Sequence, residues 1–141
     1  MPRKARERSA TGCYHIMGRG INHAAIYNDD ADNMNFLHIL DFCADEDFTI
    51  FAYCLMGNHF HLLAKADADV LQHVMKAVGI RYVAYFNRRY QRDGPLFRGR
   101  YNSQPVTTKG YFFACVALYP SQPGCCRNRA GNAGLPLEQL S

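Results

Sequence analysis

Residues 50–64 read IFAYCLMGNHFHLLA, and this stretch predicts a β-hairpin. Two apolar runs flank Gly57 and Asn58, a pair of residues that readily takes the positive φ angles of a tight turn. In the second run, His59 and His61 stand two residues apart. Because side chains alternate between the two faces of a strand, both imidazoles are expected to point the same way, with Cα atoms roughly 6.6 Å apart.

This spacing has a metal interpretation and a structural one. A divalent ion between the two rings can be held by both, since His–metal bonds are about 2.0–2.2 Å long. Alternatively, the two histidines are half-buried residues that face solvent or form local hydrogen bonds. A zinc site that adds Cys54 lacks a second Cys–His cluster to complete a tetrahedral set. The short motif by itself leaves the metal and structural roles open.

Size and composition indicate one globular domain. The chain has 141 residues, of which 48% are hydrophobic and 20% charged. No apolar run approaches the ~20 residues that cross a bilayer, and the basic N-terminus has no apolar stretch behind it. We therefore expect a cytosolic protein without a membrane partner.

The charges are unevenly distributed along the chain. Residues 29–47 contain seven acidic residues and no Lys or Arg, whereas residues 81–100 contain six arginines and one acid. This polarity indicates an anionic partner on one side of the protein, although a solvated helix face gives a similar pattern.

The order of elements predicts an α+β fold. We expect strands at 12–18, 48–56 and 59–65, helices at 31–45 and from Asp67 or Asp69 to about residue 90, and then a loop or short strand at 96–103. A last helix is expected at 109–119. These elements predict an antiparallel sheet with helices packed on it, ferredoxin-like or RRM-like in kind. Residues 1–11 are expected to form a flexible basic arm, 12–119 the domain, and 120–141 a poorly ordered tail.

Four stretches together resemble a known family. They read YHIMGRGIN at 14–22, AYCLMGNHFHLL at 52–63, RYVAYFNRRY at 81–90 and GPLFRGRY at 94–101. In order and spacing they resemble the small single-tyrosine HUH transposases, particularly the REP-associated tyrosine transposases and their insertion-sequence relatives. The resemblance covers roughly residues 12–116.

The resemblance implies a DNA transposase whose histidine pair binds Mg²⁺ or Mn²⁺. His59 and His61 then carry over as metal ligands, with Asn58 orienting one ring. A tyrosine on a late helix attacks a DNA phosphate and leaves a 5′-phosphotyrosine, which strand transfer then resolves. The implied partner is single-stranded DNA, folded as an imperfect hairpin, and the protein associates with the nucleoid when bound to it. Relatives of this size commonly act as dimers, which makes a homodimer one arrangement to test. The expected DNA contacts are Arg19, Arg81, Arg88, Arg89, Arg92, Phe97, Arg98, Arg100 and Tyr101.

The C-terminal segment departs from the family pattern. Relatives carry a segment like Arg-Tyr-Ile-x-x-Asn-Pro-Val, with the nucleophile at its tyrosine and an Asn or Gln metal ligand four residues later. Here Leu118 occupies the nucleophile position, so Tyr119 becomes the candidate nucleophile and Gln122 the candidate third ligand. The codons of residues 117–126, read one nucleotide later, can spell RYIRANPVAA. The alternative hypothesis is therefore a catalytically impaired DNA-binding remnant with a frameshifted C-terminus.

Overall fold

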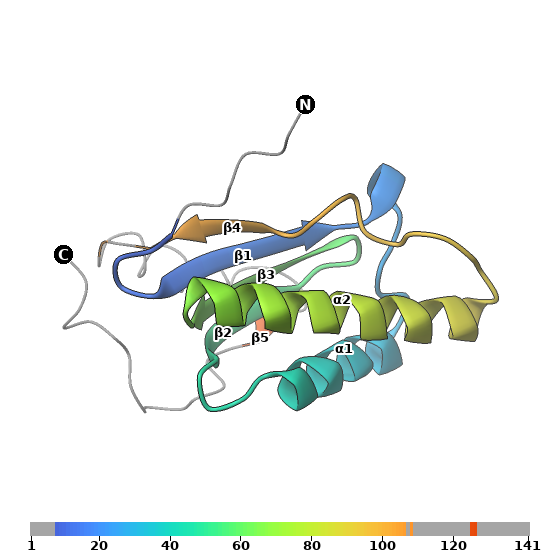
Figure 1. Ribbon diagram of the computed structural model, residues 1–141. Coiled ribbons are helices and arrows are strands. Elements are labelled where there is room, and N and C mark those ends of the chain that lie inside the picture. The colour runs from blue at the N-terminus through green and yellow to red at the C-terminus, as the bar shows by residue number, and fades with distance from the viewer. Residues whose placement is uncertain (1–7, 107, 109–124, 127–141) are drawn as a thin grey trace.

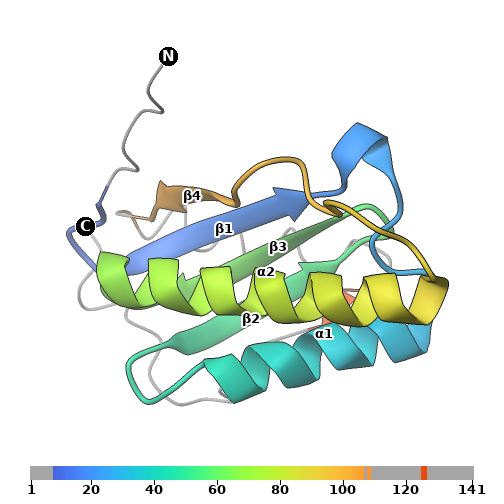
Figure 2. The same cartoon turned by 45° about the vertical axis from the view of Figure 1, so that its right-hand side comes forward.

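A computed structural model describes residues 8–106, 108 and 125–126. Its elements follow one another as β1 (Cys13–Arg19), a short 3-10 turn (Ile21–His23), α1 (Asp30–Cys43), β2 (Thr49–Leu55), β3 (His59–Lys65), α2 (Ala68–Tyr90), β4 (Asn102–Pro105) and β5 (Cys125–Cys126). The strands form one antiparallel sheet in the order β4-β1-β3-β2-β5, and both helices lie on the same face of it (Figures 1 and 2). The β4-β1-β3-β2 order with two crossover helices is ferredoxin-like, which confirms the predicted fold class.

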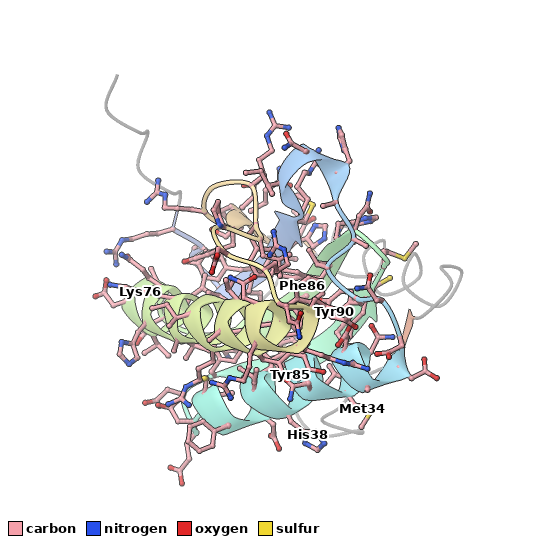
Figure 3. All side chains as sticks on the ribbon, turned by 90° about the vertical axis from the view of Figure 1, so that its right-hand side faces the viewer. Met34, His38, Lys76, Tyr85, Phe86 and Tyr90 are labelled. Carbon is pink, nitrogen blue, oxygen red and sulfur yellow. The ribbon has the colours of Figure 1, made fainter. Side chains whose placement is uncertain are left out.

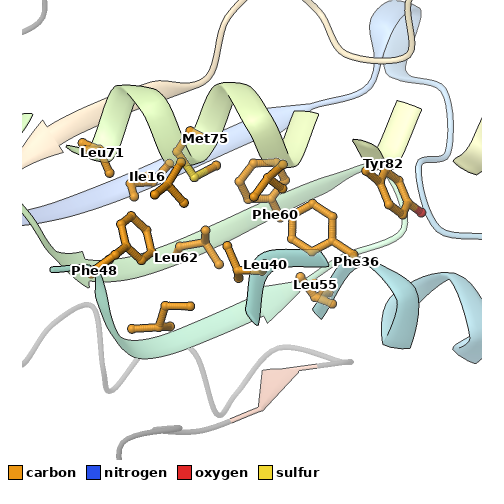
Figure 4. Close-up of a cluster of buried hydrophobic side chains, with 14 of the residues drawn as sticks. Ile16, Phe36, Leu40, Phe48, Leu55, Phe60, Leu62, Leu71, Met75 and Tyr82 are labelled. Carbon is orange, nitrogen blue, oxygen red and sulfur yellow. The ribbon is translucent and has the colours of Figure 1, made fainter. Parts of the chain in front are cut away.

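The core lies between the sheet and the helices. Ile16, Phe60 and Leu62 alternate along β1 and β3 with residues of the opposite face of the sheet, and they pack against both helices (Figure 4). Helix α2 contributes a stripe at three- and four-residue spacing, which is buried at Leu71, Val74, Met75, Val78, Tyr82 and Phe86. Each fully buried side chain of this size contributes about 1.5–3 kcal/mol of hydrophobic free energy.

A polar cluster joins α1 to α2 beside this core. The Asp29 side chain caps α1 by accepting a hydrogen bond from the backbone N–H of Asp32. The fully buried Asp32 carboxylate accepts hydrogen bonds from the hydroxyls of Tyr85 and Tyr90, which lie on α2 (Figure 3). Arg89 bridges both carboxylates. The cluster thereby fixes the two helices against each other.

The hairpin at β2 and β3 is confirmed, but the predicted turn conformation is wrong. Neither Gly57 nor Asn58 has a positive φ angle, and the turn instead closes with a hydrogen bond from Met56 N to His59 O of 2.8 Å. The reason is tertiary: the Gly57 carbonyl accepts the N–H groups of Ile26 and Tyr27 at 2.8 and 3.2 Å. These contacts from the segment before α1 set the conformation of the turn.

The predicted end of α2 at about residue 90 is confirmed. Helix α2 ends at Tyr90, where Gln91 takes the left-handed conformation and closes the helix. Part of the predicted tail is a strand, since β5 pairs with β2. The arm up to residue 7, the predicted helix at 109–119 and the remaining tail lie outside the described residues.

Candidate metal centre and nucleic-acid interface

Three histidines share the face of the sheet opposite the two helices. On β3, His59 and His61 alternate with the core residues Phe60 and Leu62, so both imidazoles lie on the face opposite α1 and α2. The neighbouring strand β1 pairs with β3 so that His15 stands opposite Leu63, one diagonal step from His61. The structure therefore places the two predicted histidines on one face and adds a third.

The three rings form a connected row. The rings of His59 and His61 are perpendicular, with centroids 5.1 Å apart. The rings of His61 and His15 are stacked, with centroids 5.2 Å apart, and His61 Nδ1 lies 3.1 Å from His15 Nε2. At the other end of the row, His59 Nδ1 lies 2.7 Å from Asn58 Oδ1. Asn58 is thus in hydrogen-bond contact with the His59 ring, and its role in orienting a metal ligand stays a prediction.

The surroundings favour the neutral form of all three imidazoles. Burial, together with the positive charge that His15, His59 and Arg19 can carry, lowers the pKa of His61 to about 4. Burial also lowers the pKa of His15, and burial together with Arg19 lowers that of His59. Neutral imidazole is the form that binds metal ions.

The donor set suits an ion that also takes oxygen ligands. The Asn58 oxygen can only accept, so His59 Nδ1 carries its proton and His59 Nε2 keeps its lone pair. Within residues 8–106, 108 and 125–126, no three His, Cys, Asp or Glu side chains form a group that could hold a metal ion, which excludes a zinc site of Cys54 with both histidines. Two imidazoles leave coordination positions for the oxygen ligands that Mg²⁺ and Mn²⁺ prefer, such as water, a phosphate or an amide oxygen.

Two glycines at the end of β1 and just beyond it, Gly18 and Gly20, allow close approach beside the histidine hairpin. A Cβ atom on Gly20 would lie 2.1 Å from the carbonyl oxygen of Ala24, and one on Gly18 would lie 2.4 Å from the Phe60 ring. The Gly20 N–H donates to the Asn58 carbonyl at 2.9 Å. This bond ties the end of β1 directly to Asn58, the residue in contact with His59.

Part of the predicted DNA-binding set gathers beside the end of β1. The 96–98 segment is held against β1 by a hydrogen bond from Arg98 N to Arg19 O and by a bridge between Gly20 and Phe97. The side chains of Arg19, Arg98 and Arg100 are exposed. They line a groove of about 800 Å³ between this segment and α2, together with the half-buried Phe97 and Tyr101.

The arginines of α2 and its end lie elsewhere, and several contact the protein itself. Arg89 forms ion pairs with Asp29 and Asp32 at 2.7 and 2.6 Å. Arg92 donates to Asn87 Oδ1 and to the Pro95 carbonyl. Arg81 lies over the Phe42 ring, 4.7 Å from its centroid, and Arg88 is exposed near the end of the helix. DNA contact by these four arginines stays a prediction.

Two predicted site residues lie outside the described part of the chain, and one residue of the site was not predicted. Tyr119 and Gln122, the candidate nucleophile and third ligand, lie outside the described residues. His15 was missed as a site residue. The alternation of Tyr14, His15 and Ile16 indicates that the His15 side chain lies on the face of the strand opposite the core. Its contact with His61 could not be predicted, because that contact depends on which strand lies next to β1.

Comparison with known proteins decides the family. The family model described as IS200-like transposase matches residues 9–116. The chain belongs to the IS200-like transposases. This confirms the resemblance seen in the four sequence stretches, and the match ends where the C-terminal segment departs from the pattern.

Solved structures of similar fold agree with this assignment. A REP-associated tyrosine transposase bound to a REP hairpin superposes with a TM-score of 0.59 at 13% identity, covering 84% of this chain and 71% of that one. A protein from Deinococcus radiodurans described as a transposase gives a TM-score of 0.55 at 18% identity, covering 85% and 94%. No curated protein matches the chain. Among the described residues of this IS200-like transposase, no helix is long and apolar enough to cross a membrane.

Proposed function

We propose that this IS200-like transposase binds single-stranded hairpin DNA and performs metal-dependent cleavage and strand transfer through a 5′-phosphotyrosine. The observation that carries the proposal is the pair of half-buried imidazoles on the face of the sheet opposite α1 and α2. His59 and His61 stand together there, and the Nδ1 atoms of both rings are in hydrogen-bond contact with neighbouring side chains. Family membership gives this pair its role in the proposal.

In the proposed site, His59 and His61 hold Mg²⁺ or Mn²⁺ through Nε2, and the Gln122 amide is the third protein ligand. A divalent ion bound there polarises a phosphoryl oxygen of the DNA. Arg19 is exposed at the end of β1, where its charge adds to the attraction for the phosphate. Asn58 holds the His59 ring in place at 2.7 Å.

Tyr119 supplies the nucleophile in this proposal. Its phenol oxygen forms a bond to the phosphorus and gives its proton to solvent, while the bond from phosphorus to the 3′ oxygen breaks. The departing 3′ oxygen takes up a proton from solvent and leaves as a free 3′ hydroxyl. The phosphodiester energy stays in the tyrosyl phosphate bond. A 3′ hydroxyl of another DNA end can therefore reverse the step, which is strand transfer.

The groove beside β1 is the proposed binding surface for DNA. Arg98, Arg100 and Arg19 offer charge for the phosphates, and Phe97 and Tyr101 offer rings for base stacking. The structural neighbour that is bound to a REP hairpin supports a folded single strand as the partner. We propose that these five residues make the main contacts, with Arg81, Arg88, Arg89 and Arg92 as further candidates.

A second candidate function is that of a DNA-binding remnant without catalysis. The family match ends at residue 116, and the chain then reads Ala117-Leu118-Tyr119-Pro120 in place of the expected nucleophile segment. A one-residue offset turns a side chain by about 100° around a helix, and a nucleophile placed 1 Å away from its productive position loses about 100-fold in rate. This observation favours binding with impaired cleavage.

One assay separates the two functions. The full chain is incubated with Mn²⁺ and end-labelled imperfect hairpins that carry single-stranded flanks, and covalent adducts are resolved on a denaturing gel. An adduct that disappears in Tyr119→Phe and in His61→Ala, but persists in the control His38→Ala on the exposed side of α1, supports the transferase. Hairpin binding without an adduct supports the remnant, and absence of both binding and adduct contradicts both functions.

A repaired variant sharpens this comparison. Residues 117–126 are replaced by RYIRANPVAA, the sequence of the shifted reading frame. If the native chain binds hairpins without forming an adduct and the repaired chain forms one, the remnant hypothesis is supported. If the repaired chain also forms no adduct, the frameshift explanation is refuted.

A further inference from the structure

His15 contacts a proposed metal ligand without being a ligand itself. Its Nε2 atom lies 3.1 Å from Nδ1 of His61, and its ring stacks on that of His61 at an interplanar angle of 25°. His15 is buried at 9% exposure, held between β3 and β4 in the sheet. Since no three potential ligands among the described residues form a metal-binding group, His15 does not complete a three-histidine site with His59 and His61.

The contact can have its proton on either of the two nitrogens. If His61 Nδ1 carries the proton and donates to His15 Nε2, then His61 Nε2 keeps its lone pair for a metal ion. If His15 Nε2 carries it, neutral His61 holds its own proton on Nε2, and that atom cannot bind a metal. The direction of this one hydrogen bond therefore decides whether His61 is competent as a ligand.

The neighbouring histidine shows which direction fits a shared site. His59 Nδ1 faces the oxygen of Asn58, which can only accept, so the proton of His59 is on Nδ1. If His61 follows the same pattern, both rings present Nε2, and the two ligand atoms are chemically equivalent. Metal-binding histidines commonly donate their other N–H to an acceptor that fixes the tautomer and the ring orientation.

We propose that His15 is a positioning residue, which accepts the Nδ1 proton of His61 and so selects the tautomer that presents Nε2 to the divalent ion. This inference rests on the proposed function, because it concerns the same metal site. It assigns a role in that site to β1, the strand next to the histidine hairpin. Loss of such an acceptor lowers metal affinity by roughly 10–100-fold.

The test uses the full chain and two readouts that do not depend on DNA cleavage. Long-range ¹H–¹⁵N spectra of the metal-free protein report which ring nitrogen of His61 carries the proton, and calorimetric titration measures Mn²⁺ affinity. The variant His15→Phe keeps an aromatic ring for stacking but has no acceptor, whereas His15→Gln restores one through its amide oxygen. The matched control is His38→Phe, at an exposed histidine on α1.

We expect His61 to carry its proton on Nδ1 in the wild type and to become a tautomer mixture in His15→Phe. Mn²⁺ affinity falls about 10–100-fold in His15→Phe and recovers to within a few-fold in His15→Gln, and His38→Phe matches the wild type. A His61 proton on Nε2 in the wild type, or unchanged Mn²⁺ affinity in a folded His15→Phe, overturns the inference. A wild type with the expected tautomer and Mn²⁺ binding but no DNA adduct refutes strand transfer and supports the role of His15.

Discussion

The substitution Asp32→Asn removes the charge at the centre of the α1–α2 cluster while keeping its volume. Asp32 is fully buried and accepts four hydrogen bonds. Its Oδ1 accepts from the Tyr85 hydroxyl at 2.8 Å and from Arg89 Nη1 at 2.6 Å. Its Oδ2 accepts from the Asn28 backbone N–H at 2.9 Å and from the Tyr90 hydroxyl at 2.6 Å. An asparagine has one oxygen, so two of these four donors lose their acceptor.

The expected cost follows from those two bonds. Hydrogen bonds to a charged group contribute about 1.5–3 kcal/mol each, and a donor left buried without an acceptor retains its desolvation penalty. Arg89 keeps its pair with Asp29 at 2.7 Å, so its guanidinium is not left without a carboxylate. We therefore expect Asp32→Asn to lower the free energy of unfolding by about 3–5 kcal/mol. At ~4 °C per kcal/mol, Tm falls by roughly 12–20 °C.

Urea unfolding followed by circular dichroism measures this change, and the control is Asp30→Asn. Asp30 lies in the same first turn of α1 but is exposed, so its substitution removes only a helix-dipole interaction of about 0.3–1 kcal/mol. If the free energy of unfolding of Asp32→Asn lies within about 1 kcal/mol of the wild-type value, the description of Asp32 as the acceptor of four hydrogen bonds is wrong.

Three further predictions concern the close approach, the DNA groove and the histidine face. Gly20→Ala places a Cβ atom 2.1 Å from a backbone oxygen and lowers the free energy of unfolding by about 1–3 kcal/mol. Gly79→Ala adds a Cβ atom in open space on α2 and raises the free energy of unfolding by about 0.5–1 kcal/mol. Chemical denaturation of both variants checks that the two changes have opposite signs. Arg98→Ala weakens hairpin DNA binding and reduces the slope of log affinity against log salt concentration by about 0.7–0.9 per lost phosphate contact. Arg81→Ala changes the affinity and this slope less. Fluorescence anisotropy titrations measure both quantities, and equal effects of the two substitutions argue against the groove as the DNA-binding surface. Without metal, the folded protein is destabilised as pH falls from the ordinary histidine pKa of 6.5 towards about 4. Over this range His61 binds a proton in the unfolded chain but stays neutral in the folded protein, where its pKa is lowered. A His61→Phe variant whose stability falls as steeply over that range contradicts this origin.

The sequence predicts most of the fold because its signals are local. Alternation on β1 and β3, the three- and four-residue stripe on α2 and the cap at Asp29 each depend on a few neighbouring residues. The conformation of Gly57 could not be predicted in this way. It depends on hydrogen bonds from Ile26 and Tyr27, about thirty positions earlier in the chain, which no turn propensity encodes.

In the candidate site, too, the sequence predicts local features but not contacts between distant residues. The shared face of His59 and His61 follows from a two-residue spacing on one strand, and the structure has it. The contact between His15 and His61 spans 46 positions, and it exists because β1 lies next to β3. The position of Arg89 in a basic run predicted a DNA contact. In the structure Arg89 forms ion pairs with Asp29 and Asp32, at the start of α1, which lie far from it in the sequence. The metal, the DNA partner and the nucleophile come from the family resemblance.

Pulsed electron paramagnetic resonance of the full chain with one equivalent of Mn²⁺ tests most directly whether this face of the sheet binds the ion. Our account predicts coupling of the Mn²⁺ electron spin to the nitrogens of two imidazoles, reduced to one in His59→Ala or His61→Ala and unchanged in His38→Ala. Spectra without nitrogen coupling, or with coupling that survives loss of both His59 and His61, contradict the metal centre and with it the proposed activation of a DNA phosphate.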